Sequence, residues 1–252
     1  APEDLGASGT KTIDLKGVVE PISRIEIRFK TTKVLYQMIA PGPANISKIE
    51  LVDGSRALHS LSGYENQALA YYSTPGISME HGQHIQTQSE VDMYHLNFGR
   101  YLWDPMLAFL PDKFKNPQLK ITWDEDVADT SVTANEIEIW LHLFDDKRPT
   151  PIGFLQAIEH DSYANGGQNS YKETLLPTDY VIRQMLLRSY RDGYEPWVQH
   201  DQVRLDENNQ KSVPWEYTDL ESYYRRQKAF NPAIVTPFVG EPSAAGYVYY
   251  VP

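Results

Sequence analysis

Alternating apolar and polar residues predict β-strands along most of this chain. In residues 24–30, Ile25, Ile27 and Phe29 alternate with charged residues. Residues 135–144 carry isoleucine or leucine at every second position from 137 to 143. A period of two places the apolar side chains on one face, so each strand is half-buried. Shorter runs predict further strands at residues 11–15, 34–39, 49–54, 91–98, 118–123, 152–158, 203–207, 234–239 and 247–251.

One arrangement of elements occurs twice. The strand at residues 49–54 is followed by a helical segment at 62–72, and the strand at 203–207 is followed by one at 218–224. The two strands are 154 residues apart (203 minus 49). A repeat at this spacing predicts two domains of similar plan, each with a strand, a turn and a short helix.

Both predicted helices begin with the same local signal. Ser62 precedes Glu65 by three positions, and Thr218 precedes Glu221 by three. In such a capping box the hydroxyl and the carboxylate each accept a hydrogen bond from a backbone N–H that the helix leaves free. We therefore expect both helices to be capped in this way.

Proline and glycine punctuate the chain and favour an all-β fold. The 252 residues include 17 prolines and 15 glycines, and short strands with proline-rich turns are typical of sandwiches and barrels. Residues 145–151 are charged and contain two prolines, which predicts a stiff linker. We expect a flexible N-terminal arm at 1–10, a first domain at 11–147 and a second at 148–252.

The second predicted domain is shorter than the first. After the counterpart of its strand at residues 91–98, the first half continues to residue 145, whereas the second half has no such continuation. We therefore expect the second domain to lack its last strands. Residues 181–190, in this half, are apolar on one side and fit either a strand or a helix.

Charge and cysteine content narrow the function. The net charge is −11 and the basic residues are scattered, which disfavours direct binding to a nucleic-acid backbone. Because the chain contains no cysteine, it has no disulfides, thiolate metal sites or cysteine nucleophiles. No apolar run approaches the roughly 18 residues that a membrane-spanning helix needs.

Two segments are candidate metal sites. The acidic loop after residue 123 offers Asp124, Asp126 and Asp129 as oxygen ligands for calcium, although the EF-hand spacing is absent. His81 and His84 stand next to Glu80 in the one histidine cluster of the sequence, but the histidine spacing of a cupin is absent as well. A solvated loop is the simpler interpretation of both segments.

Other residues suggest catalysis or ligand binding only weakly. Glu159, His160 and Asp161 are adjacent, but neighbours in a strand point to opposite faces and no serine lies in a glycine-flanked elbow. Tyr247, Tyr249 and Tyr250 could form an aromatic platform for sugars or bases. We expect a protein that is not an enzyme and needs no cofactor.

Taken together, the two β-rich halves, the paired segments at 49–72 and 203–224, and the linker at 145–151 resemble the double jelly-roll major capsid proteins of the adenovirus, tectivirus and corticovirus-like lineage. The resemblance implies two tandem jelly-roll sandwiches with short helices in the connecting loops. It also implies a virion protein of a bacteriophage, assembled in the host cytoplasm. Three copies would form a pseudo-hexameric trimer that tiles an icosahedral shell.

The resemblance implies partners as well: a homotrimer, neighbouring capsomers, penton or minor capsid proteins, and an internal membrane. Two other classes remain open. One is a monomeric carbohydrate-binding β-sandwich that uses exposed aromatic residues. The other is a jelly-roll metalloenzyme built on His81 and His84.

Overall fold

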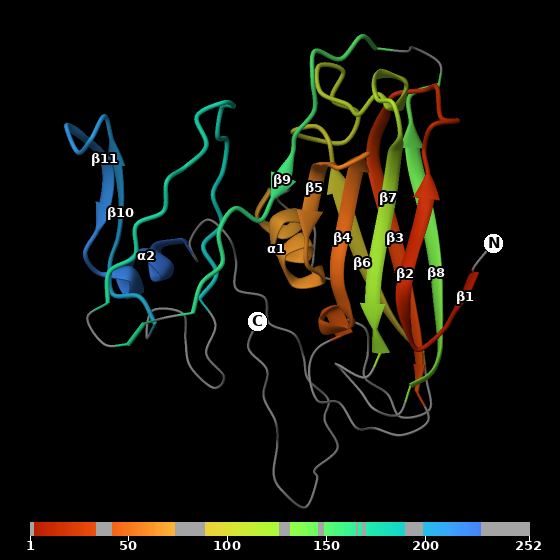
Figure 1. The fold of residues 1–252 in the computed structure, drawn as a ribbon, viewed down its shortest axis with the longest axis horizontal. Helices are drawn as coiled ribbons and strands as arrows, with labels where there is room; N and C mark the ends of the chain where they lie inside the picture. The colour runs from red at the N-terminus through yellow and green to blue at the C-terminus, as the bar shows by residue number, and fades with distance from the viewer. Residues whose placement is uncertain are drawn as a thin grey trace, which may run out of the picture. The chain divides into compact units, whose positions relative to one another are not determined.

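The computed structural model describes residues 3–33, 42–73, 89–125, 132–145, 149–164, 166–167, 170–189 and 199–227. They belong to two compact units, one reaching Glu159 and the other beginning at His160. Figure 1 shows the strands of the first unit as two layers. In the described ranges, no helix has the length and apolar character needed to cross a membrane.

The first unit contains two β-sheets. One sheet has the order β1-β8-β3-β6 and the other the order β2-β7-β4-β5-β9. The strands are β1 (Glu3–Leu5), β2 (Ser8–Asp14), β3 (Ile22–Lys33), β4 (Ile46–Asp53), β5 (Arg56–Leu61), β6 (Ser89–Asn97), β7 (Pro117–Asp124), β8 (Val132–Leu143) and β9 (Ala157–Ile158). The helices are α1 (Gly63–Ser73) and the short 3-10 turns η1 (Gly42–Asn45) and η2 (Pro111–Lys113).

The pairing of the first eight strands is that of a jelly roll. β1 pairs with β8, β2 with β7, β3 with β6 and β4 with β5, always antiparallel. The chain is therefore one long hairpin folded over on itself, and its strands alternate between two facing sheets. Eight strands arranged as two Greek keys in two sheets define the jelly roll. The all-β prediction is confirmed, and the first unit is a jelly roll.

The core lies between the two sheets and comes from the predicted inner faces. Ile25, Ile27 and Phe29 of β3 are fully buried, as are Leu51 of β4 and Ile121 of β7. Complete burial of such a side chain contributes about 1.5–3 kcal/mol. The alternation of apolar residues therefore identified the packed face of these strands correctly.

The first copy of the repeat is a β-hairpin followed by a helix. β4 turns through Gly54, whose φ of 62° favours glycine, and returns as β5 before α1 begins. The sequence analysis did not predict β5. Its buried residues include the polar His59 and Ser60, so the segment lacks a period-two pattern.

Residues 3–14 are not the loose arm that we expected. β2 pairs with β7 over seven residues, and the Trp123 indole Nε1–H donates to the Gly6 carbonyl at 2.8 Å. A Cβ built at Gly9 would lie 3.2 Å from the Trp123 ring, so the strand passes close to that ring. Backbone pairing orders this segment and does not require an apolar sequence.

The chain stays on the first roll beyond the predicted linker. Ile152 N–H donates to the Met106 carbonyl at 3.0 Å, and Leu155 N–H donates to the Phe98 carbonyl at 2.8 Å. The Phe154 ring packs edge-to-face on Phe98 and on Phe109. β9 then pairs with β5 in parallel. The first unit thus extends to Glu159, twelve residues past the boundary expected at 147 (159 minus 147).

The second unit contains the second copy of the hairpin and helix. β10 (Val203–Glu207) pairs with β11 (Ser212–Tyr217), and α2 (Leu220–Gln227) follows. The β10–β11 turn has positive φ at Asn208, Asn209 and Gln210. β11 begins and ends 156 residues after β5 (212 minus 56 and 217 minus 61). The repeat is therefore more regular than the sequence analysis indicated.

The second unit does not show a complete roll in its described residues. Residues 170–189 have no assigned helix or strand, apart from the undescribed neighbours, although 181–190 was expected to form one or the other. The strands expected at 34–39, 234–239 and 247–251 lie outside the described residues. The second jelly roll, with or without its last strands, remains a prediction.

Candidate interaction surface

The predicted metal sites gain no support. Asp124 is exposed at the end of β7, whereas Asp126 and Asp129 lie outside the described residues. Glu80, His81 and His84, and the tyrosine set Tyr247, Tyr249 and Tyr250, also lie outside them. In the part of the chain that the structure describes, no group of three or more His, Cys, Asp or Glu side chains could hold a metal ion.

Glu159, His160 and Asp161 are not brought together as a catalytic group. His160 Nε2 donates to the Leu175 carbonyl at 2.7 Å. Asp161 accepts from the Thr174 hydroxyl at 2.6 Å, which lowers the pKa of its carboxyl. Each side chain is thus held by a different partner, as expected for residues that are adjacent only in sequence.

Helix α1 closes one edge of the roll. Buried Asn66 donates from Nδ2 to His59 Nε2 at 3.2 Å and accepts from the His95 backbone N–H at 3.1 Å. His59 belongs to β5 and His95 to β6, so one amide joins the edge strands of the two sheets. Gln67 Nε2 also donates to the Met93 carbonyl of β6 at 3.4 Å. Covering a strand edge in this way prevents it from pairing with another chain.

The two helices differ at their N-terminal caps. Ser62 and Glu65 form the predicted capping box, with Ser62 N–H donating to Glu65 Oε2 at 2.8 Å and Glu65 N–H to Ser62 Oγ at 3.4 Å. α2 is capped instead by Asp219, which accepts from Ser222 N–H at 3.1 Å. Because α2 begins at Leu220, the predicted cap at Thr218 is one residue too early.

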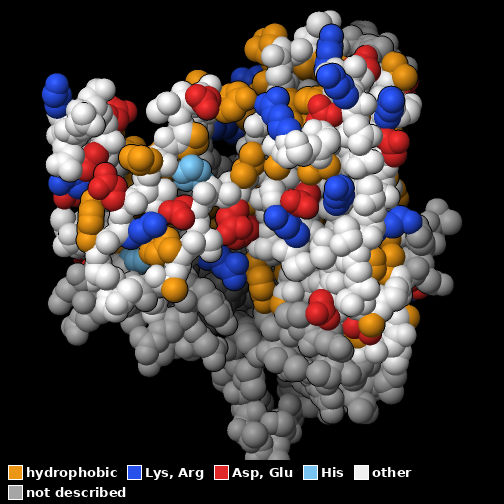
Figure 2. All heavy atoms as spheres, viewed as in Figure 1, with side chains coloured by type: hydrophobic (Ala, Val, Ile, Leu, Met, Phe, Trp, Pro, Cys, Tyr) orange, Lys and Arg blue, Asp and Glu red, His pale blue; other side chains and the backbone are white. Residues whose placement is uncertain are grey.

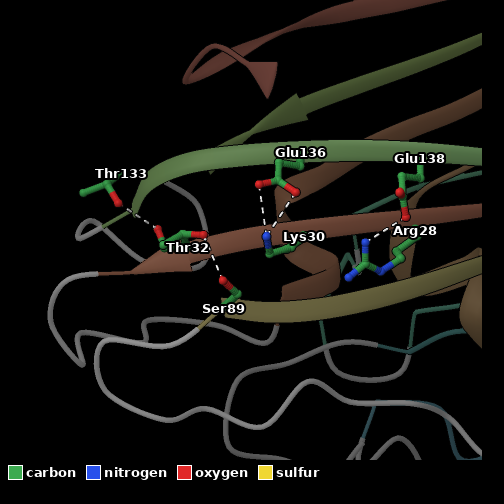
Figure 3. Close-up of polar contacts among 7 residues, drawn as sticks. All are labelled: Arg28, Lys30, Thr32, Ser89, Thr133, Glu136 and Glu138. Atoms are coloured by element: carbon green, nitrogen blue, oxygen red, sulfur yellow. Dashed lines mark hydrogen bonds and ion pairs between the residues drawn. The ribbon is translucent and has the colours of Figure 1, made fainter. Parts of the chain in front are cut away.

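The outer face of the four-stranded sheet is a ladder of paired charges (Figure 3). Arg28 lies 2.8 Å from Glu138, and the Lys30 ammonium lies 3.0 Å from both oxygens of Glu136. Further along β8, His142 Nε2 lies 3.2 Å from Glu26. Exposed pairs of this kind stabilise a fold by about 1 kcal/mol or less. Their partners lie within the sheet, so this part of the face is polar and internally satisfied.

Acidic and basic side chains are also interspersed over the described part of the face in Figure 2. Trp140 departs from this pattern. It stands between Glu138 and His142 on the outward side of β8, and 47% of its surface is exposed. A tryptophan in the polar phase of an alternating strand is the one signal of this surface that the sequence carries.

The loop at residues 99–107 presents further apolar side chains at the end of the same sheet. Trp103 has a φ of 67°, which is rare for a bulky residue. Its N–H donates to Ser23 Oγ at 2.8 Å, and its ring packs edge-on against Phe144 at 5.3 Å and His142 at 6.1 Å between centroids. The loop is thereby fixed to the ends of β3 and β8.

Asp104 holds the loop in shape from within. This carboxylate is fully buried, and it accepts from Arg100 Nε at 2.7 Å and from Met106 N–H at 3.0 Å. The hydrogen bond from Arg100 keeps the pKa of Asp104 well below its usual range, so the carboxyl stays ionised. A Cβ at Gly99 would lie 2.7 Å from Asp104 Cβ, so the loop requires glycine there.

We define the aromatic patch as the exposed apolar side chains of this loop, its neighbouring segment and β8. Its members, with exposed fractions, are Tyr101 (56%), Trp103 (44%), Met106 (46%), Trp140 (47%) and Ile152 (78%). Ile152 is included because its N–H is bonded to the Met106 carbonyl. The patch is built on rigid backbone and has the composition of a protein-binding surface.

Comparisons with known proteins add limited information. No protein-family model matches the chain, and no curated protein matches it. Among solved structures, the STIV MCP is similar at 18% identity and a TM-score of 0.38, over 56% of this chain and 47% of that one. The PBCV-1 virus capsid is similar at 14% identity and a TM-score of 0.38, over 56% of this chain and 41% of that one.

The matched part therefore spans less than half the length of either solved chain. The jelly-roll assignment comes from the strand pairings of the first unit, where all four pairs of the folded hairpin are present.

Proposed function

We propose that this protein is a major capsid protein, with two jelly rolls per chain and three chains per pseudo-hexameric capsomer. The observation that carries the proposal is the repeated hairpin and helix, β4-β5-α1 and β10-β11-α2, with β5 and β11 offset by 156 residues at both ends. In the first unit this hairpin is the fold of the jelly roll itself. Its return in the second unit supports a second roll of the same plan.

Two similar rolls suit the tiling of a closed shell. A trimer of double rolls presents six similar corners, so it can sit where a hexamer would and pack against six neighbours. The edge of β6 is covered by α1 through Asn66 and Gln67, which protects the roll from unspecific strand pairing. Lateral contacts would then be made by loops and side chains.

The proposal includes the place of assembly and the partners. A chain without cysteine needs no oxidising compartment, which suits assembly in the cytoplasm of a host cell and a final location in the virion. The net charge of −11 suits a shell surface that does not contact packaged nucleic acid. Neighbouring capsomers are the expected partners.

The test is the assembly state of the purified full chain, measured by size-exclusion chromatography with light scattering and by negative-stain electron microscopy. We expect a trimer of about 87 kDa (three times 28.9 kDa) or larger particles with hexagonal outlines. A protein that stays monomeric at every concentration, and that shows no hexagonal particles, would contradict the proposal. Tight binding of the monomer to an oligosaccharide would instead favour the carbohydrate-binding class.

A further inference from the structure

We infer that the aromatic patch is the surface through which this chain binds a second copy of itself. The inference deepens the proposed function and rests on it. It assigns the contact to five named side chains, Tyr101, Trp103, Met106, Trp140 and Ile152, on one end of the first roll.

The backbone of the loop is strained in a way that burial does not explain. A bulky residue at a φ of 67° costs about 1–3 kcal/mol and persists only where its surroundings hold it. Ser23 and the Phe144 ring hold Trp103 here, yet nearly half of the tryptophan remains exposed. The strain therefore keeps the Trp103 ring at the surface in a fixed orientation.

Preorganisation of this kind favours recognition. Asp104 ties Arg100 and Met106 to one buried carboxylate, so the side chains on either side of Trp103 lose little further freedom on binding. Rigid, well-packed aromatic anchors are the residues that dominate protein interfaces.

The chemistry of the patch points to a protein partner instead of a sugar. Tryptophan, tyrosine, methionine and arginine are the residues enriched in protein interfaces. Met106 and Ile152 offer neither a ring face nor a polar side-chain group to a sugar, and Ile152 is the most exposed member of the patch. A partner must therefore bring apolar surface of its own.

Charge and chain path favour a second copy as that partner. Arg100 edges the patch with a guanidinium that is half exposed, whereas its partner Asp104 is buried. A copy with 34 acidic and 23 basic residues presents a surface that attracts this cation. The chain leaves the first unit at β9, beside β5, and so departs from the other sheet than the one that carries Trp140.

The experiment compares the full chain with the triple variant Tyr101→Ser, Met106→Ser, Trp140→Ser by sedimentation velocity over a range of concentrations. Trp103 is kept, so the loop retains its packing on Phe144. We expect self-association to weaken at least tenfold, roughly the effect of losing one interface hot spot. The matched control is Tyr72→Ser on α1, which is 43% exposed and should leave self-association unchanged.

A second measurement maps the contact in an otherwise unchanged chain. A benzophenone amino acid at position 101 is photoactivated in the assembled protein, and the crosslinked peptides are identified by mass spectrometry. Crosslinks between copies support the inference. Crosslinks only within one chain, or none in an assembled sample, overturn it, because the patch is then covered by the same chain or by nothing.

The outcomes separate the two proposals. If the wild-type chain assembles and the triple variant assembles equally well, the inference fails and the proposed function stands. If the wild-type chain is a monomer at all concentrations, the proposed function fails and the inference fails with it. If the triple variant does not fold, the crosslinking result decides.

Discussion

Asn66 donates a hydrogen bond from Nδ2 to His59 Nε2 at 3.2 Å, and both side chains are buried between α1 and the edge of the roll. The same amide accepts from the His95 backbone N–H. One side chain therefore satisfies polar groups on β5 and β6 at once. This relationship makes α1 part of the roll and leads to two predictions.

Replacing Asn66 should destabilise the protein strongly. Asn66→Leu leaves His59 Nε2 and the His95 N–H without this partner in a buried site, which costs about 2–4 kcal/mol. The free energy of unfolding, from urea titration followed by circular dichroism, measures the loss. Asn116→Leu, at an exposed position, is the control and should change stability by less than about 0.5 kcal/mol. Equal effects of the two substitutions would show that the amide contributes nothing special.

Stability should fall in mildly acidic solution because of His59. Burial lowers the pKa of this imidazole from 6.5 to about 4, so the folded protein holds it neutral while the unfolded chain takes up a proton. The contribution is complete above pH 6.5 and is lost as the pH falls towards 4, by up to about 3 kcal/mol. Urea unfolding of the wild type and of His59→Gln at pH 7 and pH 4.5 tests this expectation. The variant should lose less stability between the two values, and a parallel loss would contradict the assignment to His59.

The buried ion pair of the patch loop predicts a further effect. Asp104→Asn removes the charge that holds Arg100, Met106 and the loop together, and we expect a loss of about 2–4 kcal/mol. Because the pKa of Asp104 lies far below its usual range, its contribution should persist at pH 5 and be lost only in stronger acid. Thermal unfolding at pH 7 and pH 5 measures both statements. Glu20→Gln, at an exposed position, is the control.

The order of the N-terminal segment can be tested with two glycines. A Cβ at Gly9 meets the Trp123 ring, whereas a Cβ at Gly6 meets nothing within 4 Å. Gly9→Val should therefore destabilise the first roll by about 1–3 kcal/mol through overpacking, and Gly6→Val should have a smaller effect. Differential scanning fluorimetry compares the two variants. If Gly9→Val is tolerated as well as Gly6→Val, β2 is not packed on β7 as described.

Several elements were predictable because their signal is local. The alternation in β3 and β8 assigned inward and outward faces correctly, and Ser62 with Glu65 capped α1 as expected. The cap of α2 was placed one residue early because Thr218 and Asp219 are both good caps and only the helix start decides between them. β5 was missed because tertiary contacts bury its polar residues.

By itself, the amino-acid sequence determined the all-β character, the inner faces of the long strands and the first helix cap. These features depend on side-chain periodicity and on neighbours three or four residues away. Only the tertiary structure decided that β1 pairs with β8, that residues 3–14 are ordered, that the first unit extends to Glu159, and that Asp104 presents Trp103 at the surface. Each of these joins residues that are distant in the chain or sets a backbone angle through such contacts, so no local pattern records it.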